Sequence, residues 1–505
     1  MKYQSQKFNM KKLTIYIYLL ATLNFSCESQ KEPDLPIIMI DTFGQNIPDE
    51  PKISAQMAIS YNGIENITDY TDSSYYYRGN IGIEIRGHTS QGFPKKQYGL
   101  ETRNADGDNL SVSLFGMPEQ KDWILYAPFS DKSLMRNVIA YDIFRSMGYY
   151  APRTKFCQLV INGDYVGVYV FMEKIKKDVG RVDISRPTAE NLSGGYLLEF
   201  DGLDRVDSTD LYFLTEKKQQ PYTIKFPRKK NITADQIAWI KNYINNFEKT
   251  LFSDSFNDPN TGFNQFIDSP SWIDYILINE VFRNFDSFQS STYLYKKKDE
   301  KLFAGPVWDF NIAMGNTNYD NSNFTEGWLM DERYLPSRLL EDSVFTNEYK
   351  KRWKTLRENQ LALPKILFLI DDYTRLLDTA QKTNFERWSV LGEYVWPNRF
   401  VGNSYEDEIN YLKQWLKARF SWIDAQFYGT TYDSELNITG DIYELYNGGA
   451  QKQFGYLLGG KKDGIWIEWF KNGQIMSNKN YNNGVPIGEW IYYDKDGTIK
   501  KLKDY

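Results

Sequence analysis

The side chains that could do chemistry in this 505-residue chain are mainly carboxylates, amides, hydroxyls, lysines and arginines. The sequence contains one histidine, His88, and two cysteines, Cys27 and Cys157. A single histidine nearly excludes His-based zinc sites and any mechanism that needs two histidines. The net charge is −6, and no basic stripe with interleaved aromatic residues occurs, so we expect no nucleic-acid partner.

Two aspartates, Asp286 and Asp309, stand in polar segments that follow predicted secondary structure. Phosphoryl transfer requires a carboxylate beside the acceptor hydroxyl, oxygen ligands for magnesium and a lysine that contacts the phosphates. It requires neither histidine nor thiol, which suits this composition. In protein kinases these parts follow a fixed order along the chain. The candidate residues of this sequence occur in the same order: the polar turn 86–92, then Lys95 or Lys96, then the two aspartates.

The elements that must position these residues can be predicted from hydrophobic periodicity and turn signals. Alternating apolar residues predict strands on both sides of the turn 86–92, and Asn162-Gly163 between two apolar runs predicts a hairpin over 156–171. A one-sided apolar pattern predicts a helix over 132–147 with Asp131 as its N-cap. Further strands are predicted at 37–40, 196–201, 292–295 and 302–307, and further helices at 234–252, 271–283 and through most of 346–428.

Four motifs occur in order along the chain. They are Arg86-Gly87-x-x-Ser90-x-x-Phe93-Pro94-Lys95-Lys96-x-Tyr98, Asp131-x-Ser133-Leu134-Met135-Arg136-Asn137, Asn162-Gly163-x-Tyr165-x-Gly167-x-Tyr169-x-Phe171-x-Glu173, and Asn284-x-Asp286-Ser287-Phe288 followed by Tyr293-Leu294-Tyr295 and Gly305-Pro306-Val307-Trp308-Asp309-Phe310. Together they resemble the motifs of the CotH family of atypical kinases, named after spore coat protein H. Each motif is weak by itself, and it is their shared order that makes the resemblance specific.

The resemblance implies an α+β fold of the atypical protein-kinase type, with a β-rich N-terminal lobe and a helical C-terminal lobe. It implies ATP and Mg²⁺ as cofactors, with Mn²⁺ as an alternative metal, and a protein as the phosphate acceptor. Carried over by position, Asp286 would be the catalytic carboxylate. The metal ligands would be Asp309, Ser291 and Asn311, and the nucleotide would be bound by Arg86, Ser90, Lys95, Lys96 and Glu173.

Two positions depart from the family pattern. Ser291 stands where the most kinase-like members have a metal-binding Asn, and Asn311 stands where many members have Asp. A serine hydroxyl is shorter than a carboxamide, and Mg²⁺ demands near-ideal geometry, so both changes weaken the expected metal site. Two interpretations follow: an active exported kinase, or a degenerate member that acts as a surface binding or scaffold protein.

Structural roles are the alternative for each site residue. Asp286 and Asp309 could cap or close turns, Arg86 could be a buried structural residue, and Lys95 with Lys96 could form a solvated pair on an edge strand. A third functional class, glycoside hydrolysis by a carboxylate pair, would use Glu199 and Asp201, which lie two residues apart on one strand face. No specific motif supports that third class.

The N-terminus is predicted to be a targeting segment. Lysines precede an apolar run over 13–25, which is too short to span a bilayer and has the length of a signal-peptide core. Ser26-Cys27 after this run resembles a lipoprotein cleavage site, with Cys27 as the lipidated residue. A plain secretory signal or an uncleaved anchor is the alternative. Lipidation would remove Cys27 from any disulfide with Cys157.

The last 70 or so residues contain an internal repeat. Gly440, Gly464 and Gly488 are 24 residues apart, and Ile442, Trp466 and Trp490 keep the same spacing. Each unit predicts a β-hairpin, and the array over 438–505 resembles MORN-type repeats. Such arrays extend a domain or bind proteins or membranes, so a protein partner for these repeats is expected.

The predicted organisation has four parts: a signal peptide with its lipidated cysteine at 1–27, a tether and N-terminal strand region at 28–74, the CotH kinase-like domain at 75–430 and the repeats at 438–505. We expect a protein of the cell envelope, held to a membrane by its lipid anchor and facing the periplasm or the exterior. Its acceptor would be an exported or surface protein.

Overall fold

The computed structural model describes residues 35–61, 75–206, 209–319, 321–430, 440–446 and 450–505. Cys27 and the predicted signal peptide lie outside these described residues. Within them the chain forms seven α-helices, α2 to α8, and three β-sheets, so the expected α+β class is confirmed. None of the helices described combines the length and the apolar character that crossing a membrane requires.

The N-terminal part is a closed β-barrel with the strand order β1-β2-β3-β4-β5-β7-β6. Its strands are β1 (Ile37–Asp41), β2 (Ile53–Ser60), β3 (Tyr77–Arg86), β4 (Gln97–Arg103), β5 (Asp122–Tyr126), β6 (Thr154–Ile161) and β7 (Asp164–Glu173). Parallel pairing of β1 with β6 closes the barrel, which therefore includes two strands from the range 28–74. Alternate apolar residues such as Ile81 and Ile83 fill its interior.

Of two local features of this part, one agrees with the sequence prediction and one differs from it. The β6–β7 hairpin turns through Asn162 and Gly163, both with positive φ, as a type I′ turn requires. The α-helix between β5 and β6, α2 (Arg136–Ser146), begins later than predicted, because Leu134 has a φ of 67° and interrupts helical geometry. Asp131 still accepts a hydrogen bond from the backbone N–H of Arg136 at 2.9 Å.

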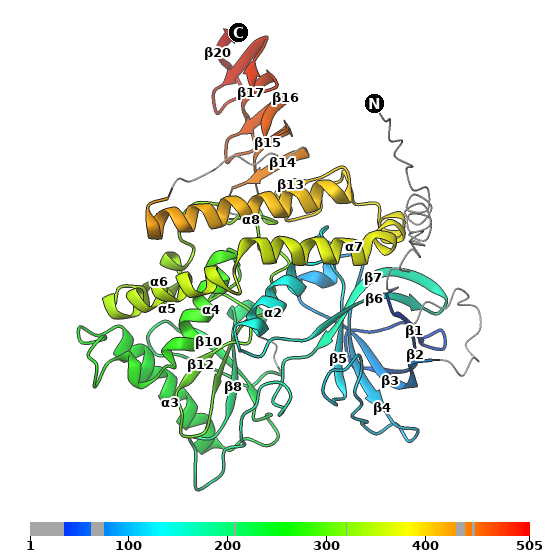
Figure 1. Cartoon of the computed structure of the whole chain (residues 1–505), viewed down its shortest axis with the longest axis vertical. Helices are drawn as coiled ribbons and strands as arrows, with labels where there is room; N and C mark the ends of the chain where they lie inside the picture. The colour runs from blue at the N-terminus through cyan, green and yellow to red at the C-terminus, as the bar shows by residue number, and fades with distance from the viewer. Residues whose placement is uncertain (1–34, 62–74, 207–208, 320, 431–439, 447–449) are drawn as a thin grey trace, which may run out of the picture.

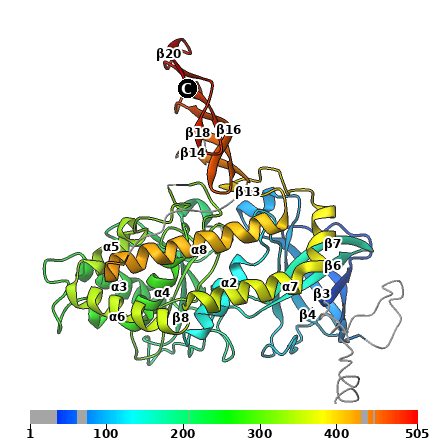
Figure 2. The ribbon, with the colours of Figure 1, turned by 45° about the horizontal axis from the view of Figure 1, so that its top comes forward.

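The second part packs helices against a five-stranded sheet of order β12-β11-β8-β10-β9 (Figure 1). Its strands are β8 (Tyr196–Phe200), β9 (Tyr212–Leu214), β10 (Pro221–Phe226), β11 (Thr292–Lys296) and β12 (Leu302–Ala304). Its helices are α3 (Ala234–Leu251), α4 (Ser269–Val281), α5 (Tyr334–Leu340), α6 (Ser343–Glu358), α7 (Leu363–Arg387) and α8 (Tyr405–Tyr428). Figure 2 shows the long helices α7 and α8 lying across the body, and the C-terminal end of α7 lies against β7 of the barrel.

The C-terminal residues form a third, antiparallel sheet that projects from the body (Figures 1 and 2). Its strands are β13 (Phe400–Val401), β14 (Gly440–Leu445), β15 (Gln451–Leu458), β16 (Lys461–Trp469), β17 (Ile475–Asn482), β18 (Val485–Pro486), β19 (Glu489–Tyr493) and β20 (Ile499–Asp504). One contact recurs at the 24-residue spacing: Trp466 Nε1 donates to Tyr456 O and Trp490 Nε1 donates to Asn480 O. The MORN-type assignment itself stays a prediction.

Candidate active site

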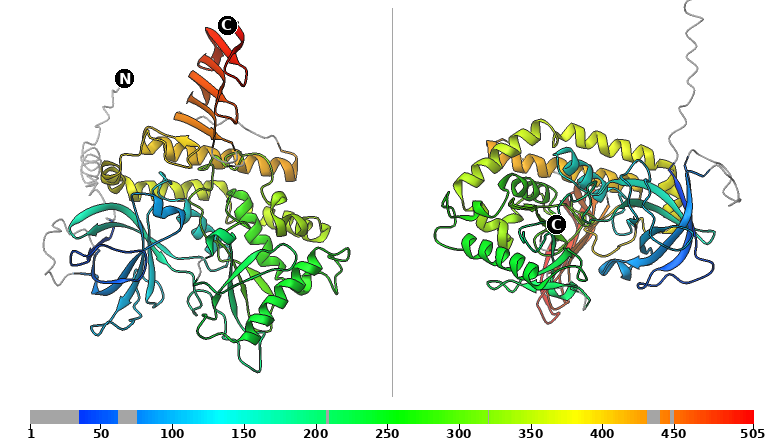
Figure 3. Two further views of the ribbon diagram at one scale, coloured as in Figure 1. Left: turned by 180° about the vertical axis from the view of Figure 1, so that it is seen from behind. Right: turned by 90° about the horizontal axis from the view of Figure 1, so that it is seen from below.

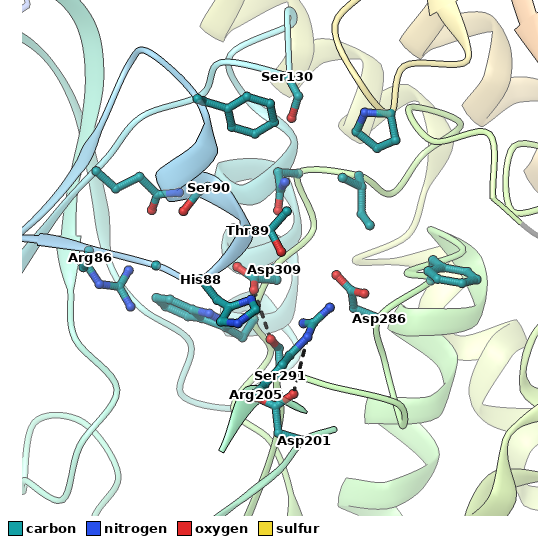
Figure 4. A pocket seen from close by; sticks show the side chains of 18 of the residues that line it. Arg86, His88, Thr89, Ser90, Ser130, Asp201, Arg205, Asp286, Ser291 and Asp309 are labelled. Carbon is teal, nitrogen blue, oxygen red and sulfur yellow. Dashed lines mark hydrogen bonds and ion pairs between the residues drawn. The ribbon is translucent and has the colours of Figure 1, made fainter. Parts of the chain in front are cut away.

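A pocket of about 480 Å³ lies where the barrel meets the helical part (Figure 4). The turn between β3 and β4 borders it, with the 3-10 helix η1 (Thr89–Gly92), as does the end of β8 with η2 (Leu203–Arg205). The remaining walls are the loop after α4, the loop after β12 and the segment that precedes β13. Ser130, between β5 and α2, also lines the pocket, so six separate stretches of the chain contribute to it.

Six of the predicted site residues line this pocket: Arg86, Ser90, Asp286, Ser291, Asp309 and Asn311. Asp286 and Asp309 come from different loops and are 23 positions apart in the sequence, yet both side chains face the same space (Figure 4). Arg86 lies against the ring of Trp308, with its guanidinium carbon 5.6 Å from the ring centroid.

The loop that carries Asp286 is held by its own polar groups and by the neighbouring loop. Asn284 Nδ2 donates to Asn279 Oδ1 at 3.0 Å and to the backbone oxygen of Trp308 at 3.3 Å. The backbone oxygen of Asp286 accepts from the N–H of Ser290 at 2.8 Å. These bonds tie the end of α4 to the loop after β12, so the two aspartates are positioned together.

The loop that carries Asp309 is anchored to α2. Asn137 Oδ1, on α2, accepts a hydrogen bond from the backbone N–H of Phe310 at 2.6 Å. Trp308 stacks on Tyr141, one helical turn further along α2. Asp309 and Ser291 both have positive φ, 51° and 49°, a conformation that non-glycine residues rarely adopt and that clusters at functional sites.

Burial raises the pKa of both carboxyls. Burial raises the pKa of Asp309 to about 6, and the nearby charge of Asp286 contributes further, against the opposing effects of Arg86 and Ser291. Burial also raises the pKa of Asp286, while Arg205 acts to lower it. Two carboxylates that repel each other in a protected pocket form a place where a cation would be stabilised.

Glu199, Asp201 and Arg205 are pocket residues that sequence reasoning did not assign to this site. Glu199 pairs with Lys225 at 2.6 Å, and Asp201 lies 4.0 Å from Arg205 (Figure 4). Burial raises the pKa of Asp201 to about 7, with a smaller contribution from Glu199. The sequence signal for the two acids was their spacing of two residues on one strand, but that spacing suggested a glycosidase pair. No sequence signal indicated that Arg205 would lie in the pocket.

The predicted phosphate-binding lysines and Glu173 are not among the described residues that line the pocket. Lys95 is buried between β7 and α7, where its Nζ donates to Val168 O at 2.6 Å and to Asn384 Oδ1 at 2.8 Å. Lys96 Nζ donates to the backbone oxygen of Gln91 at 2.6 Å. Glu173 is fully buried and pairs with Arg153 and Arg181, at 3.0 and 3.5 Å.

The cations of the pocket are therefore arginines. Arg86 and Arg205 line it from opposite parts of the chain, and His88 lies near them in the exposed turn (Figure 4). Guanidinium groups bind phosphate oxygens in a bidentate way, so these two residues can take the place of a lysine as an anion-binding pair.

The oxygen atoms of the pocket suit a hard cation. Carboxylate, hydroxyl and amide groups are present, from Asp286, Asp309, Ser291 and Asn311. Over the part of the chain that the structure describes, no group of three or more His, Cys, Asp or Glu residues is arranged to hold a metal ion. Mg²⁺ is commonly bound by one or two carboxylates together with substrate phosphates and water, so this donor set fits magnesium bound with a nucleotide.

Comparison with known proteins agrees with the resemblance noted in the sequence. Residues 83–423 match the family described as CotH kinase protein. The inner spore coat protein H of Bacillus subtilis (strain 168) is 22% identical over 337 residues, which cover 63% of this chain and 85% of that protein. The matched range 83–423 contains every residue named above as lining the pocket.

Proposed function

The chain belongs to the CotH kinase family, and on that premise we propose that it transfers a phosphoryl group from ATP, with Mg²⁺, to Ser or Thr hydroxyls of exported or surface proteins. One observation carries the proposal. Asp286 and Asp309, from separate loops, open onto one pocket together with the cations Arg86 and Arg205. This is the charge arrangement that phosphoryl transfer needs, because catalysis of that reaction consists mostly of positioning and electrostatic stabilisation.

The pocket residues fit the proposed cofactors. A volume of about 480 Å³ lies within the usual range for small-molecule sites. Asp309, Asn311 and Ser291 would hold Mg²⁺, and Arg86 with Arg205 would contact phosphate oxygens. When bound, the metal would neutralise phosphate charge. The β-rich barrel and the helical part would then act as the two lobes on either side of the nucleotide.

The residues of this chain would share the work as follows. Asp286 would orient the acceptor hydroxyl and accept its proton, which requires the carboxylate to be ionised. Arg86 and Arg205 would stabilise the negative charge that is spread over the transferred group. The anchor between Asn137 and Phe310 would keep Asp309 at a constant position relative to Asp286.

The proposed location is the cell envelope. The matched relative bears the name of a spore coat protein, and the predicted lipidation of Cys27 would attach this chain to a membrane. The signal peptide at 1–27, the tether beyond it and the MORN-type nature of the C-terminal repeats belong to the same proposal. The acceptor would then be an exported or surface protein.

A thermal-shift measurement tests the catalytic proposal. ATP with Mg²⁺ or Mn²⁺ should raise the melting temperature of the wild-type chain, since a ligand that binds only the native state stabilises it. Asp309→Ala should lose this shift. Asp286→Asn should keep the shift but transfer phosphate at least about 100-fold more slowly to an accepting protein. Absence of any shift in the wild-type chain would contradict the proposed nucleotide site.

A degenerate, non-catalytic protein is the second candidate, and a specific observation favours it. Ser291 donates its hydroxyl to Asp309, so the residue that replaces the family's metal-binding Asn is engaged with the proposed metal ligand itself. The lysine expected at the phosphates is also buried elsewhere in the fold. In that case the chain would bind a surface partner without transferring phosphate, and the same thermal-shift measurement separates the two candidates.

A further inference from the structure

Arg205 brings a positive charge to the acidic side of the pocket. It ends η2, the short 3-10 helix that follows β8, and its Nε lies 4.0 Å from Asp201 Oδ1. Figure 4 shows its guanidinium group pointing into the space between Asp286 and Asp309. Burial raises the pKa of both of these carboxyls, and the charge of Arg205 acts in the opposite direction on each. One guanidinium group therefore serves three carboxyl groups.

Asp201, the ion-pair partner of Arg205, is connected to the loop after α4. Burial raises the pKa of Asp201, and hydrogen bonds from the backbone N–H groups of Gly202 and Ser291 act in the opposite direction. Next to these residues, β8 and β11 pair through Phe200 and Thr292. Arg205 is therefore held, through Asp201, beside the loop that carries Asp286 and Ser291.

The remaining polar groups of the pocket offer little to a second metal ion. Protein kinases hold two Mg²⁺ ions, one of them with an amide oxygen from the catalytic loop. Here the hydroxyl of Ser291 donates to Asp309 at 3.1 Å, so it lies at the first proposed metal ligand and adds no separate one. Glu199 pairs with Lys225 at 2.6 Å, and Asp201 pairs with Arg205. Two of the four carboxylates among the described lining residues thus have a cation of their own from the protein.

The second arginine of the pocket has different surroundings. Arg86 ends β3 of the barrel and lies over the ring of Trp308, whereas Arg205 belongs to the part that contains the five-stranded sheet. Figure 3 shows these two parts side by side, the barrel in blue and the sheet with its helices mostly in green. The two guanidinium groups can therefore be removed separately, each as a control for the other.

We propose that Arg205 takes the place of a second divalent cation, so that the site binds ATP with a single Mg²⁺. The inference rests on the proposed function and states its metal requirement. A guanidinium group among carboxylates supplies positive charge and repels a further cation, since like charges interact strongly in a protected pocket. It can also donate paired hydrogen bonds to phosphate oxygens. Arg205 would thus provide, from the protein, the charge that a second metal ion provides in protein kinases.

The test counts the Mn²⁺ ions that the full chain binds with adenylyl imidodiphosphate, a non-hydrolysable ATP analogue. Equilibrium dialysis gives the excess of Mn²⁺ and of analogue on the protein side, and their ratio is the number of ions per bound nucleotide. The wild-type chain should bind one ion. Arg205→Ala should bind two, because it removes the competing charge and frees Asp201. Arg205→Gln, which keeps more of the side-chain volume, should give the same gain if Arg205→Ala is unstable.

Three further variants separate charge from other effects. Arg205→Lys keeps the positive charge and should still bind one ion. The double variant Arg205→Ala/Asp201→Asn should return to one ion, because the second ion needs the carboxylate that Arg205 leaves behind. Arg86→Gln removes the same charge from the barrel side, so it should weaken binding of the analogue but keep one ion.

The outcomes distinguish this inference from the proposed function. Two ions in the wild-type chain, one ion in both Arg205→Ala and Arg205→Gln, or two ions in Arg86→Gln would overturn the role of Arg205 while the nucleotide site stands. No bound analogue in the wild-type chain would overturn the nucleotide site and this inference with it. The expected ion counts without phosphate transfer to any protein would support the role of Arg205 while the catalytic proposal fails.

Discussion

Ser291 Oγ donates a hydrogen bond to Asp309 Oδ2 across 3.1 Å, which joins the loop after α4 to the loop after β12. Both residues have positive φ, so the contact is held by two unusual backbone conformations. In the proposed kinase site the same two residues are metal ligands. The hydrogen bond therefore shows how a serine can occupy this position without leaving Asp309 unpaired.

Ser291→Asn should strengthen the response to metal. Asn tolerates positive φ better than Ser, and its carboxamide oxygen is the better Mg²⁺ ligand, so we expect a larger ATP–Mg²⁺ thermal shift than in the wild-type chain. Ser291→Ala is the matched control and should give a smaller shift, because it supplies no oxygen. Equal shifts in the two variants would show that position 291 does not contact the metal.

Asn137→Ala should uncouple α2 from the site. The substitution leaves the buried N–H of Phe310 without its acceptor, which costs about 1–3 kcal/mol of unfolding free energy and frees the Asp309 loop. Asn245→Ala is the control, because Asn245 also accepts from a backbone N–H, that of Glu216, and neither of these two residues lines the pocket. Both variants should lose stability in urea unfolding, but only Asn137→Ala should reduce the ATP–Mg²⁺ shift.

Lys95→Met should impair folding rather than nucleotide binding. Burial lowers the pKa of Lys95 to about 7, and its ammonium satisfies Val168 O and Asn384 Oδ1 at the contact between barrel and α7. Losing both bonds should reduce the unfolding free energy by about 2–3 kcal/mol, while the nucleotide-dependent shift persists. Lys96→Met, beside it, should cost less than about 1 kcal/mol. If Lys95→Met lost the nucleotide-dependent shift at unchanged stability, the result would show that Lys95 contacts the phosphates after all.

Glu408→Gln should change how stability depends on pH. Burial raises the pKa of Glu408 to about 7 despite Lys132 at 3.9 Å and the backbone N–H of Gly402 at 2.9 Å. The native chain then holds a proton that the unfolded chain has released, so its stability falls as pH rises from about 4.5 to 7. In Glu408→Gln, the decrease in unfolding free energy over this pH range should be smaller by about 1–3 kcal/mol than in the wild-type chain.

The check is urea unfolding at pH 5 and pH 7. Glu406→Gln serves as the control, since Glu406 lies exposed in the first turn of the same helix. An unchanged difference between the two pH values in Glu408→Gln would show that Glu408 is already ionised in the native chain at pH 5.

Much of the secondary structure could be predicted from local patterns. The strands around 86–92, the Asn162-Gly163 hairpin and the helices now called α3 and α4 were expected from periodicity and turn residues, and each lies close to its predicted range. Those signals are local, because they depend on side chains within a few residues of one another. The predicted start of α2 at residue 132 was wrong, and the helix begins at Arg136. The positive φ of Leu134 depends on packing and on the Asp131–Arg136 contact rather than on propensity.

The candidate site could be predicted only in part. Asp286 and Asp309 were expected together because their motifs follow one another in the kinase order, whereas Glu199, Asp201 and Arg205 were not expected at the pocket. Their placement depends on antiparallel pairing of β8 with β11, which brings residues almost 100 positions apart side by side. Such pairing leaves no local trace in the sequence.

The sequence by itself determined the family, the order of the loops that carry the two aspartates and the 24-residue repeat, because all three are recorded in residue type and spacing. Only the tertiary structure decided which cations contact the pocket. Lys95 follows the turn that is predicted to contact phosphates, yet its side chain points between β7 and α7, while Arg86 and Arg205 reach the pocket from distant segments. The direction of a strand side chain alternates with a period of two, so its surroundings are set by which sheet face is covered, and that is decided by long-range packing.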